Sequence, residues 1–177
     1  MDWGAQGRAD FGTSAKSHYN GGVEFHLRDY RESDVETLWR IDQECFAEGI
    51  AYSLPEMQAY LAQPGAFALV AEASAGGEIR GFIIGQIIAG RRASKPLGYV
   101  ITIDVRASAR ECGLGSKLMK AAEERMRIAG RRKVVLEVAV NNAAAIRFYG
   151  RHGYKKTGTH AAYYTDGTDA NEMEKAL

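Results

Sequence analysis

Apolar and polar side chains alternate over residues 23–27, which is the two-residue period of a half-buried strand. Ser33 to Glu36 then fits a helix capping box, and the apolar residues behind it recur at helical spacing. Residues 53–56 open a second, shorter helix. The pattern therefore predicts a strand and two helices, with inward-facing residues Val35, Leu38, Ile41 and Cys45 in the first helix and Met57, Tyr60 and Leu61 in the second.

Strand patterns fill the middle of the chain. Residues 67–73 and 79–89 both read as strands, and the glycine pair between them predicts a turn, so that together they form a hairpin. Residues 99–105 form a further strand, whose end meets a turn that contains glycines at residues 110–115. Three consecutive strands are therefore expected here.

Helices and strands alternate in the last part of the chain. A helix over about residues 114–129 ends at Gly130, and a second helix over residues 142–152 ends at Gly153. Residues 133–140 between them are almost wholly apolar, as expected of a strand covered on both faces.

Two strand patterns, residues 154–161 and 172–177, close the chain and flank the pair Asp166-Gly167, which is typical of hairpin turns. The complete order of predicted elements is βααβββαβαββ. This order predicts an α/β (α+β) fold with a mixed sheet and helices packed on it.

The N-terminal segment differs from the rest. Residues 1–22 show no hydrophobic period and contain five glycines, so we interpret them as a flexible leader. No internal repeat or Pro/Ser-rich linker divides the remainder. Residues 23–177 are therefore predicted to form a single domain.

The composition is that of an ordinary globular protein, with 177 residues, 46% hydrophobic and 25% charged. A formal net charge of +1 gives no electrostatic reason to expect a nucleic acid or an anionic membrane as partner. Two cysteines are too few for a disulfide framework, and no Cys or His spacing indicates a metal site. The longest apolar stretch, residues 82–89, is far shorter than the ~20 residues of a membrane helix. We therefore expect a cytoplasmic protein without a metal.

A first candidate site is the sequence RECGLG from Arg110 to Gly115, between a predicted strand and a predicted helix. Exposed amides at a helix N-terminus bind anions such as a pyrophosphate, and glycine lets the ligand approach the backbone closely. The same residues also fit an ordinary tight turn. A dinucleotide-binding motif fits worse, because Leu118 occupies the place of that motif's third glycine.

A second candidate site lies in the segment NNAAAIRFYGRHGYKKTG, residues 141–158. Asn142 is a predicted N-cap, and Ile146 and Tyr149 share one face of the helix. Taken alone, the segment also fits a short amphipathic helix with a buried tyrosine and a glycine C-cap.

Together the two motifs resemble the GCN5-related N-acetyltransferase (GNAT) superfamily. Arg110 to Gly115 matches its R/Q-x-x-G-x-G/A acyl-CoA loop, and residues 142–149 match its N-x-x-A-x-x-x-Y helix, with Ala145 and Tyr149 in place. One departure is Ala107, where the family has a proline, and this affects turn rigidity more than chemistry. Other segments resemble the ribosomal-protein alanine N-acetyltransferase (RimI-like) branch, namely Leu136-Glu137-Val138, residues 142–146 and Tyr163-Tyr164 before Asp166-Gly167.

The resemblance implies a mostly antiparallel GNAT sheet with splayed central strands, and acetyl-CoA as the co-substrate. It places backbone groups of Ile103, Asp104 and Val105 along the acetyl and pantetheine arm, with Asn142 also contacting pantetheine. An amide on that strand would hold the carbonyl oxygen as it becomes an oxyanion. The residues implied for the pyrophosphate are Arg110, Glu111, Cys112, Gly113, Leu114, Gly115 and Ser116.

The resemblance also implies that Glu137 is the general base and Tyr149 the general acid. An amine at pH 7 is mostly an ammonium ion, so a proton must be removed before it attacks. Apolar residues surround Glu137 in the sequence, and an apolar setting raises the pKa of a carboxyl group toward the range of a base. A tyrosine can protonate the departing CoA thiolate in concert with bond breaking. The alternatives are an outward-facing glutamate and a core tyrosine.

The acceptor implied by the resemblance is a primary amine, and a protein N-terminus such as that of a ribosomal protein is favoured. Tyr52, Tyr163 and Tyr164 correspond to the loops that line the acceptor groove. One alternative is a small-molecule amine such as a polyamine, an aminoglycoside or an amino acid. Another is a non-catalytic acyl-CoA-binding module, which would need neither Glu137 nor Tyr149. The chain is expected to be a monomer or a homodimer. The run of basic residues at 125–133 is interpreted as a solvated helix end.

Overall fold

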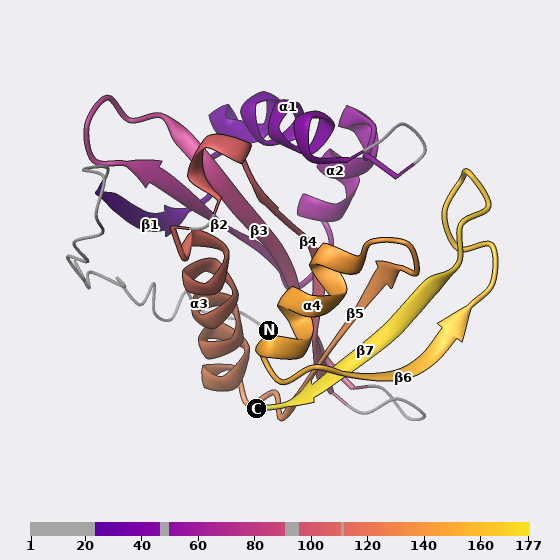
Figure 1. Ribbon diagram of the computed structural model, residues 1–177. Helices are drawn as coiled ribbons and strands as arrows, with labels where there is room; N and C mark the ends of the chain where they lie inside the picture. Colours follow the sequence, from indigo (N-terminus) through magenta and orange to yellow (C-terminus); the bar gives the residue numbers. More distant parts are fainter. Residues whose placement is uncertain (1–23, 47–49, 91–95, 111) are drawn as a thin grey trace.

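The computed structural model describes residues 24–46, 50–90, 96–110 and 112–177 (Figure 1). The leader predicted at residues 1–22 lies outside these ranges, as does Glu111 of the predicted pyrophosphate loop. The strands are β1 Phe25–Asp29, β2 Ala66–Ala73, β3 Ile79–Ile88, β4 Leu97–Val105, β5 Lys133–Ala139, β6 Lys155–His160 and β7 Ala170–Ala176. The α-helices are α1 Val35–Cys45, α2 Leu54–Leu61, α3 Leu114–Ile128 and α4 Ala143–Arg151. The predicted order of strands and α-helices is confirmed.

The described strands form one mixed sheet with the order β1-β2-β3-β4-β5-β7-β6. Neighbouring strands are antiparallel except β4 and β5, which are parallel. This parallel pair is joined only where residues 98–100 face residues 134–136, although β4 continues to Val105 and β5 to Ala139. The two strands therefore separate toward their C-terminal ends, which confirms the expected splay.

Helices cover both faces of the sheet (Figure 1). One core cluster holds the buried face of α3 together with Tyr149 of α4, and the other holds α1, α2 and the opposite face of β2 and β3. The inward faces predicted for α1 and α2 are confirmed at Leu38, Ile41 and Met57, which are fully buried. In the described part of the chain, no helix is both long enough and apolar enough to cross a membrane.

Helix ends follow the local sequence in most places. Ser53 caps α2 as expected, accepting a hydrogen bond from the Glu56 amide, and Gly130 ends α3 with φ of +77°. The capping box predicted at Ser33 is wrong. Residues 32–34 form a 3₁₀ turn before α1, and the carboxylate of Asp34 accepts hydrogen bonds from Arg28 and from the Arg31 amide.

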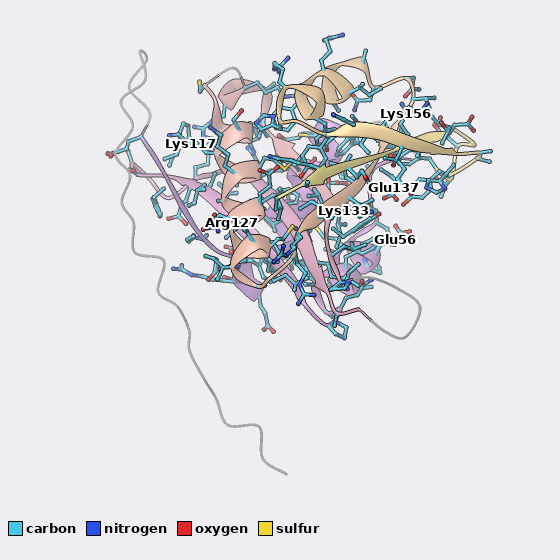
Figure 2. The ribbon with its side chains drawn as sticks, turned by 90° about the horizontal axis from the view of Figure 1, so that it is seen from below. Glu56, Lys117, Arg127, Lys133, Glu137 and Lys156 are labelled. Atoms are coloured by element: carbon cyan, nitrogen blue, oxygen red, sulfur yellow. The ribbon has the colours of Figure 1, made fainter. Side chains whose placement is uncertain are left out.

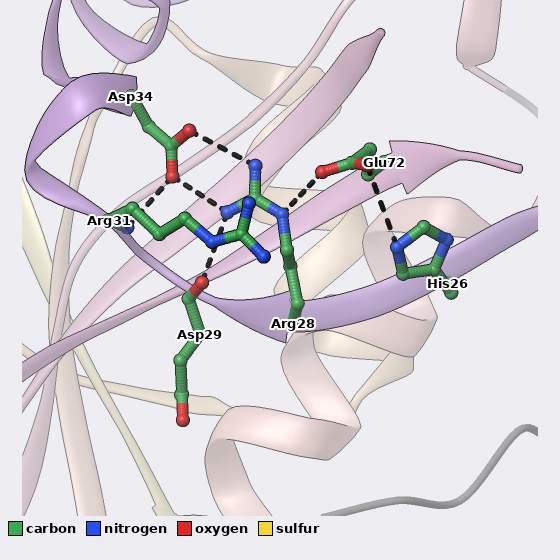
Figure 3. Close-up of polar contacts among 6 residues, drawn as sticks. All are labelled: His26, Arg28, Asp29, Arg31, Asp34 and Glu72. Atoms are coloured by element: carbon green, nitrogen blue, oxygen red, sulfur yellow. Dashed lines mark hydrogen bonds and ion pairs between the residues drawn. The ribbon is translucent and has the colours of Figure 1, made fainter. Parts of the chain in front are cut away.

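Arg28 connects the first strand to the start of α1 and to the second strand (Figure 3). Its guanidinium pairs with Asp34 at 2.7 Å and also with Glu72 of β2, and these side chains are mostly shielded from solvent. Burial by itself raises the pKa of the Asp34 carboxyl, but the hydrogen bonds from Arg28 and from the Arg31 amide outweigh it and lower that pKa. The network therefore stabilises the fold only while Asp34 is ionised.

Replacing Arg28 with methionine is expected to lower the free energy of unfolding by about 2–3 kcal/mol at pH 7, because two partly buried carboxylates lose their cation. Because the folded-state pKa of Asp34 is lowered, the contribution is complete above its ordinary pKa and disappears as the pH falls through the lowered one. Urea unfolding of the wild type and Arg28→Met at pH 7 and near pH 3 measures the difference in their free energies of unfolding. This difference should be smaller near pH 3. Arg40→Met is the control, because its exposed pair with Glu36 contributes under about 0.5 kcal/mol.

Candidate active site

The splay between β4 and β5 opens into a pocket of about 600 Å³. Its walls come from α1, β4, the start of α3, β5 and α4. Most of the residues predicted from the sequence meet there. The predicted residues that line it are Tyr52, Ile103, Asp104, Val105, Arg110, Gly113, Leu114, Gly115, Ser116, Glu137, Asn142, Tyr149 and Tyr164. Cys112 and Tyr163 are not among the lining residues.

The glycine-containing turn places the N-terminus of α3 at one end of this pocket. Gly113 has φ of +73°, a conformation that favours glycine, and Arg110 donates a hydrogen bond from Nε to the carbonyl of Val105 at 2.9 Å. A Cβ on Gly115 would lie 3.4 Å from the ring of Phe148, so α3 and α4 pack closely here. The first amides of a helix have no acceptor within it, so this end of the pocket is suited to an anion.

Helix α4, which packs against the start of α3, brings Asn142 and Tyr149 into the wall of the pocket. Asn142 is the N-cap that the sequence predicts, with its side-chain oxygen accepting from the Ala145 amide at 3.0 Å. Tyr149 is 7% exposed, and its ring packs edge-on against Phe148 and Tyr154. Burial, followed by the Asp104 carboxyl, raises the pKa of Tyr149 above its ordinary value. The phenol therefore keeps its proton at neutral pH.

Glu137 projects from the half-exposed face of β5, next to the final two strands (Figure 2). The expectation that both faces of β5 are covered is wrong, because Val134, Leu136 and Val138 are buried while the residues between them are only partly buried. The expectation that apolar residues surround the Glu137 side chain is also wrong, because this side chain is on the partly buried face. Its carboxylate accepts a hydrogen bond from Tyr99, and side chains of His160 and Glu172 lie nearby.

Tyr99 is a site residue that the sequence reasoning missed. It faces Val135 in the β4–β5 pair and therefore shares a face with Glu137, two residues further along β5. Burial and the hydrogen bonds with Glu137 and Tyr163 raise the pKa of Tyr99. Its hydroxyl thus stays protonated and orients the Glu137 carboxylate. The sequence predicts which residues of β4 and β5 alternate between the two faces of the sheet. It does not predict the register between the two strands, which brings Tyr99 to Glu137.

The sequence reasoning also did not predict a role for two buried carboxyl side chains near the pocket, those of Asp104 and Asp42. Asp104, which was expected to act through its backbone, is 1% exposed, accepts a hydrogen bond from Thr102, and has its pKa raised by burial. Asp42 of α1 accepts from the Tyr52 amide at 2.8 Å, and burial raises the pKa of Asp42 to about 6. Asp42 thereby holds Tyr52 at the rim of the pocket.

Two of the remaining predicted tyrosines, Tyr52 and Tyr164, line the pocket. The Tyr52 hydroxyl donates to the carbonyl of Ile101 at 3.5 Å. Tyr163 packs edge-on against Tyr164 and is 47% exposed, so it stands beside the pocket and not in its wall. The basic run at residues 125–133 lies elsewhere, and acidic partners pair with Arg127 and Lys133.

Comparison with known proteins agrees with this geometry. Residues 35–154 match the model of the acetyltransferase (GNAT) family. An N-alpha-acetyltransferase of Sulfurisphaera tokodaii is 31% identical over 163 residues, covering 88% of this chain and 95% of the relative. The chain therefore belongs to the acetyltransferase (GNAT) family, and it is an N-acetyltransferase.

Solved structures show the same fold. Ard1 from Thermoplasma volcanium superposes with a TM-score of 0.74 at 25% identity, covering 86% of this chain and 97% of that one. Arabidopsis thaliana NAA60 in complex with acetyl-CoA gives 0.71 at 20% identity, with 86% and 98% covered. A ribosomal-protein-alanine N-acetyltransferase from Brucella melitensis, of the branch predicted from the motifs, gives 0.69 at 20%, with 86% and 99% covered.

Proposed function

We propose that this chain transfers the acetyl group of acetyl-CoA to the α-amino group of a protein N-terminus. The observation that carries the proposal is one pocket lined by the N-terminal residues of α3 and by both Glu137 and Tyr149. The name of the Sulfurisphaera tokodaii relative supports a protein N-terminus as acceptor, and the NAA60 complex supports acetyl-CoA as donor.

Acetyl-CoA would bind along the C-terminal half of β4. The first amides of α3, from Leu114 to Ser116, would hold the pyrophosphate, and Asn142 would contact the pantetheine arm. The thioester would then reach the gap where β4 and β5 separate. There β4 is paired only with β3, so an amide of β4 that faces β5 would be free to bind the carbonyl oxygen as negative charge develops on it, an interaction that contributes ~3–4 kcal/mol in acyl transfer.

Glu137 would remove a proton from the acceptor ammonium. The free amine attacks the thioester carbon, a C–N bond forms, and the C–S bond breaks. Tyr149 would give its proton to the departing CoA sulfur and later regain one from solvent. The nitrogen loses its second proton to solvent as the amide forms, and Glu137 then releases its own proton to solvent. Two protons are released and Tyr149 takes one back, so each turnover yields an amide, CoA thiol and one proton, without a covalent enzyme intermediate.

The aromatic rim favours an extended peptide over a small amine. Tyr52 and Tyr164 offer apolar walls with hydroxyl groups, and Tyr163 extends that surface outward. We further propose that residues 23–177 act as one acetyltransferase domain. A cytoplasmic location and a monomeric or homodimeric state stay predictions.

Incubating the full chain with acetyl-CoA and either N-terminal peptides or free amines tests the acceptor. Turnover is expected on peptides, with little on polyamines, aminoglycosides or amino acids. Turnover on free amines alone would contradict the proposal that the acceptor is a protein N-terminus. Calorimetric titration with CoA tests the cofactor site independently of the acceptor. If CoA does not bind, the proposed acetyl-CoA site is wrong.

A further inference from the structure

Three side chains capable of binding a metal meet beside the pocket: Glu137 of β5, His160 at the end of β6, and Glu172 of β7. One ligand atom from each lies within 4.8 Å of the other two. Glu137 and Glu172 are direct partners in the antiparallel β5–β7 pair, and the β6–β7 pair brings His160 to the same place. Only the folded sheet assembles this group, so no metal-ligand spacing is visible in the sequence.

The two carboxylates of this cluster face each other, and the nearest permanent cation, Lys133, is paired directly with Glu174 and acts on Glu172 only at longer range. Glu172 contacts His160 at 3.2 Å and accepts a hydrogen bond from Thr157, while Glu137 accepts one from Tyr99. Within the described ranges, neither glutamate forms an ion pair with lysine or arginine. Like charges directly opposite each other in an antiparallel pair are unfavourable, so a cation bound between the two carboxylates would stabilise both of them.

We propose that Glu137, His160 and Glu172 form a binding site for a divalent transition metal ion such as Zn²⁺. Carboxylate oxygens and a neutral imidazole nitrogen are ordinary zinc ligands, and three protein ligands leave a fourth tetrahedral position for water. The side chains of His160 and Glu172 are 46% and 33% exposed, so an ion reaches them directly from solvent. A histidine ligand favours zinc over magnesium, which prefers six oxygen ligands.

Metal binding has a consequence for catalysis, and this consequence rests on the proposed function. A metal ion on the Glu137 carboxylate would occupy the lone pairs that accept the ammonium proton. The metal would therefore inhibit acetyl transfer, and removing it with a chelator would restore activity.

The chain contains a matched control for this site. His26 is 49% exposed and lies 3.8 Å from Glu72, much as His160 lies beside Glu172. Glu72, however, is already paired with Arg28 (Figure 3). Among the described residues no third ligand joins His26 and Glu72, and Arg28 already neutralises Glu72, so this pair is a poor metal site although it also joins an exposed histidine to a glutamate.

Calorimetric titration of the full chain with ZnCl₂ tests the site without any substrate. One zinc ion per chain is expected, with affinity falling more than about tenfold in His160→Ala and in Glu172→Gln and unchanged in His26→Ala. The visible absorption of bound Co²⁺ should show the same ranking. Equal affinity in the wild type and His160→Ala, or no binding in the wild type, would overturn the proposal.

An acetylation assay with added ZnCl₂ separates the site from the catalytic proposal. Wild-type activity should fall as zinc occupies the site, while His160→Ala keeps its activity at the same zinc concentration. Calorimetric binding without inhibition would support the metal site and count against Glu137 as the base. Loss of activity in both proteins would show that zinc acts elsewhere, for example on a cysteine, and would overturn the predicted inhibition through this site.

Discussion

Replacing Tyr149 with phenylalanine is expected to lower kcat for acetyl transfer by about 10²-fold or more, the usual contribution of a general acid. Phenylalanine keeps the ring that packs against Phe148 and Tyr154, so only the hydroxyl is lost. Because burial and Asp104 raise the pKa of Tyr149, the wild-type phenol is fully protonated when the thiolate leaves. Initial rates at saturating acetyl-CoA measure kcat, and calorimetry should show unchanged affinity for CoA.

Tyr154→Phe is the matched control for this substitution. Tyr154 is also a buried tyrosine of the same core, but its hydroxyl points to the sulfur of Met119 and it does not line the pocket. We expect kcat to stay unchanged in this variant. An unchanged kcat in Tyr149→Phe, or equal losses in both variants, would assign Tyr149 to packing alone.

Local sequence features predict most of this fold, because local physics decides them. Gly130 and Gly153 end helices with positive φ, and Ser53 and Asn142 cap helices through their own side chains. Strand periods locate every strand to within a few residues. The family resemblance then supplies the mostly antiparallel sheet with splayed central strands, which periodicity alone does not contain.

Features that depend on the register between strands distant in the chain could not be predicted from the sequence. A register shift between Ile84 and Gly85 leaves an extra residue in β4. As a result Ile101 packs in one core while Ile103 packs with the other, so alternation read from one end of β4 assigns the wrong face at the other end. The same limit concealed the contact between Tyr99 and Glu137.

The error at Ser33 had a different origin. A capping box is a match of residue types, whereas the Asp34 carboxylate forms its bonds with Arg28 on the preceding strand and with the Arg31 amide. A tertiary ion pair therefore decided how α1 begins.

Replacing Glu137 with glutamine is expected to lower the rate by about 10²-fold near pH 7, and by progressively less as the pH rises. The α-amino group of a peptide has a pKa of about 8, so at pH 7 most acceptor molecules carry a proton that the base must remove. Above about pH 9 the acceptor is already neutral, and glutamine should serve nearly as well. Rates measured from pH 6.5 to about 9.5 give the profile, and a loss independent of pH would contradict the role of base.

Two further variants decide whether the effect belongs to the carboxylate itself. Glu174→Gln removes a half-buried glutamate of β7 that pairs with Lys133 at 2.8 Å outside the pocket, and its pH profile should match the wild type. Tyr99→Phe removes the hydroxyl that orients Glu137 but leaves the carboxylate in place. A carboxylate that is present but less well oriented still accepts protons, so we expect a smaller loss than in Glu137→Gln with the same recovery at high pH. A larger loss in Tyr99→Phe would instead make the tyrosine, and not the glutamate, the group that the reaction depends on.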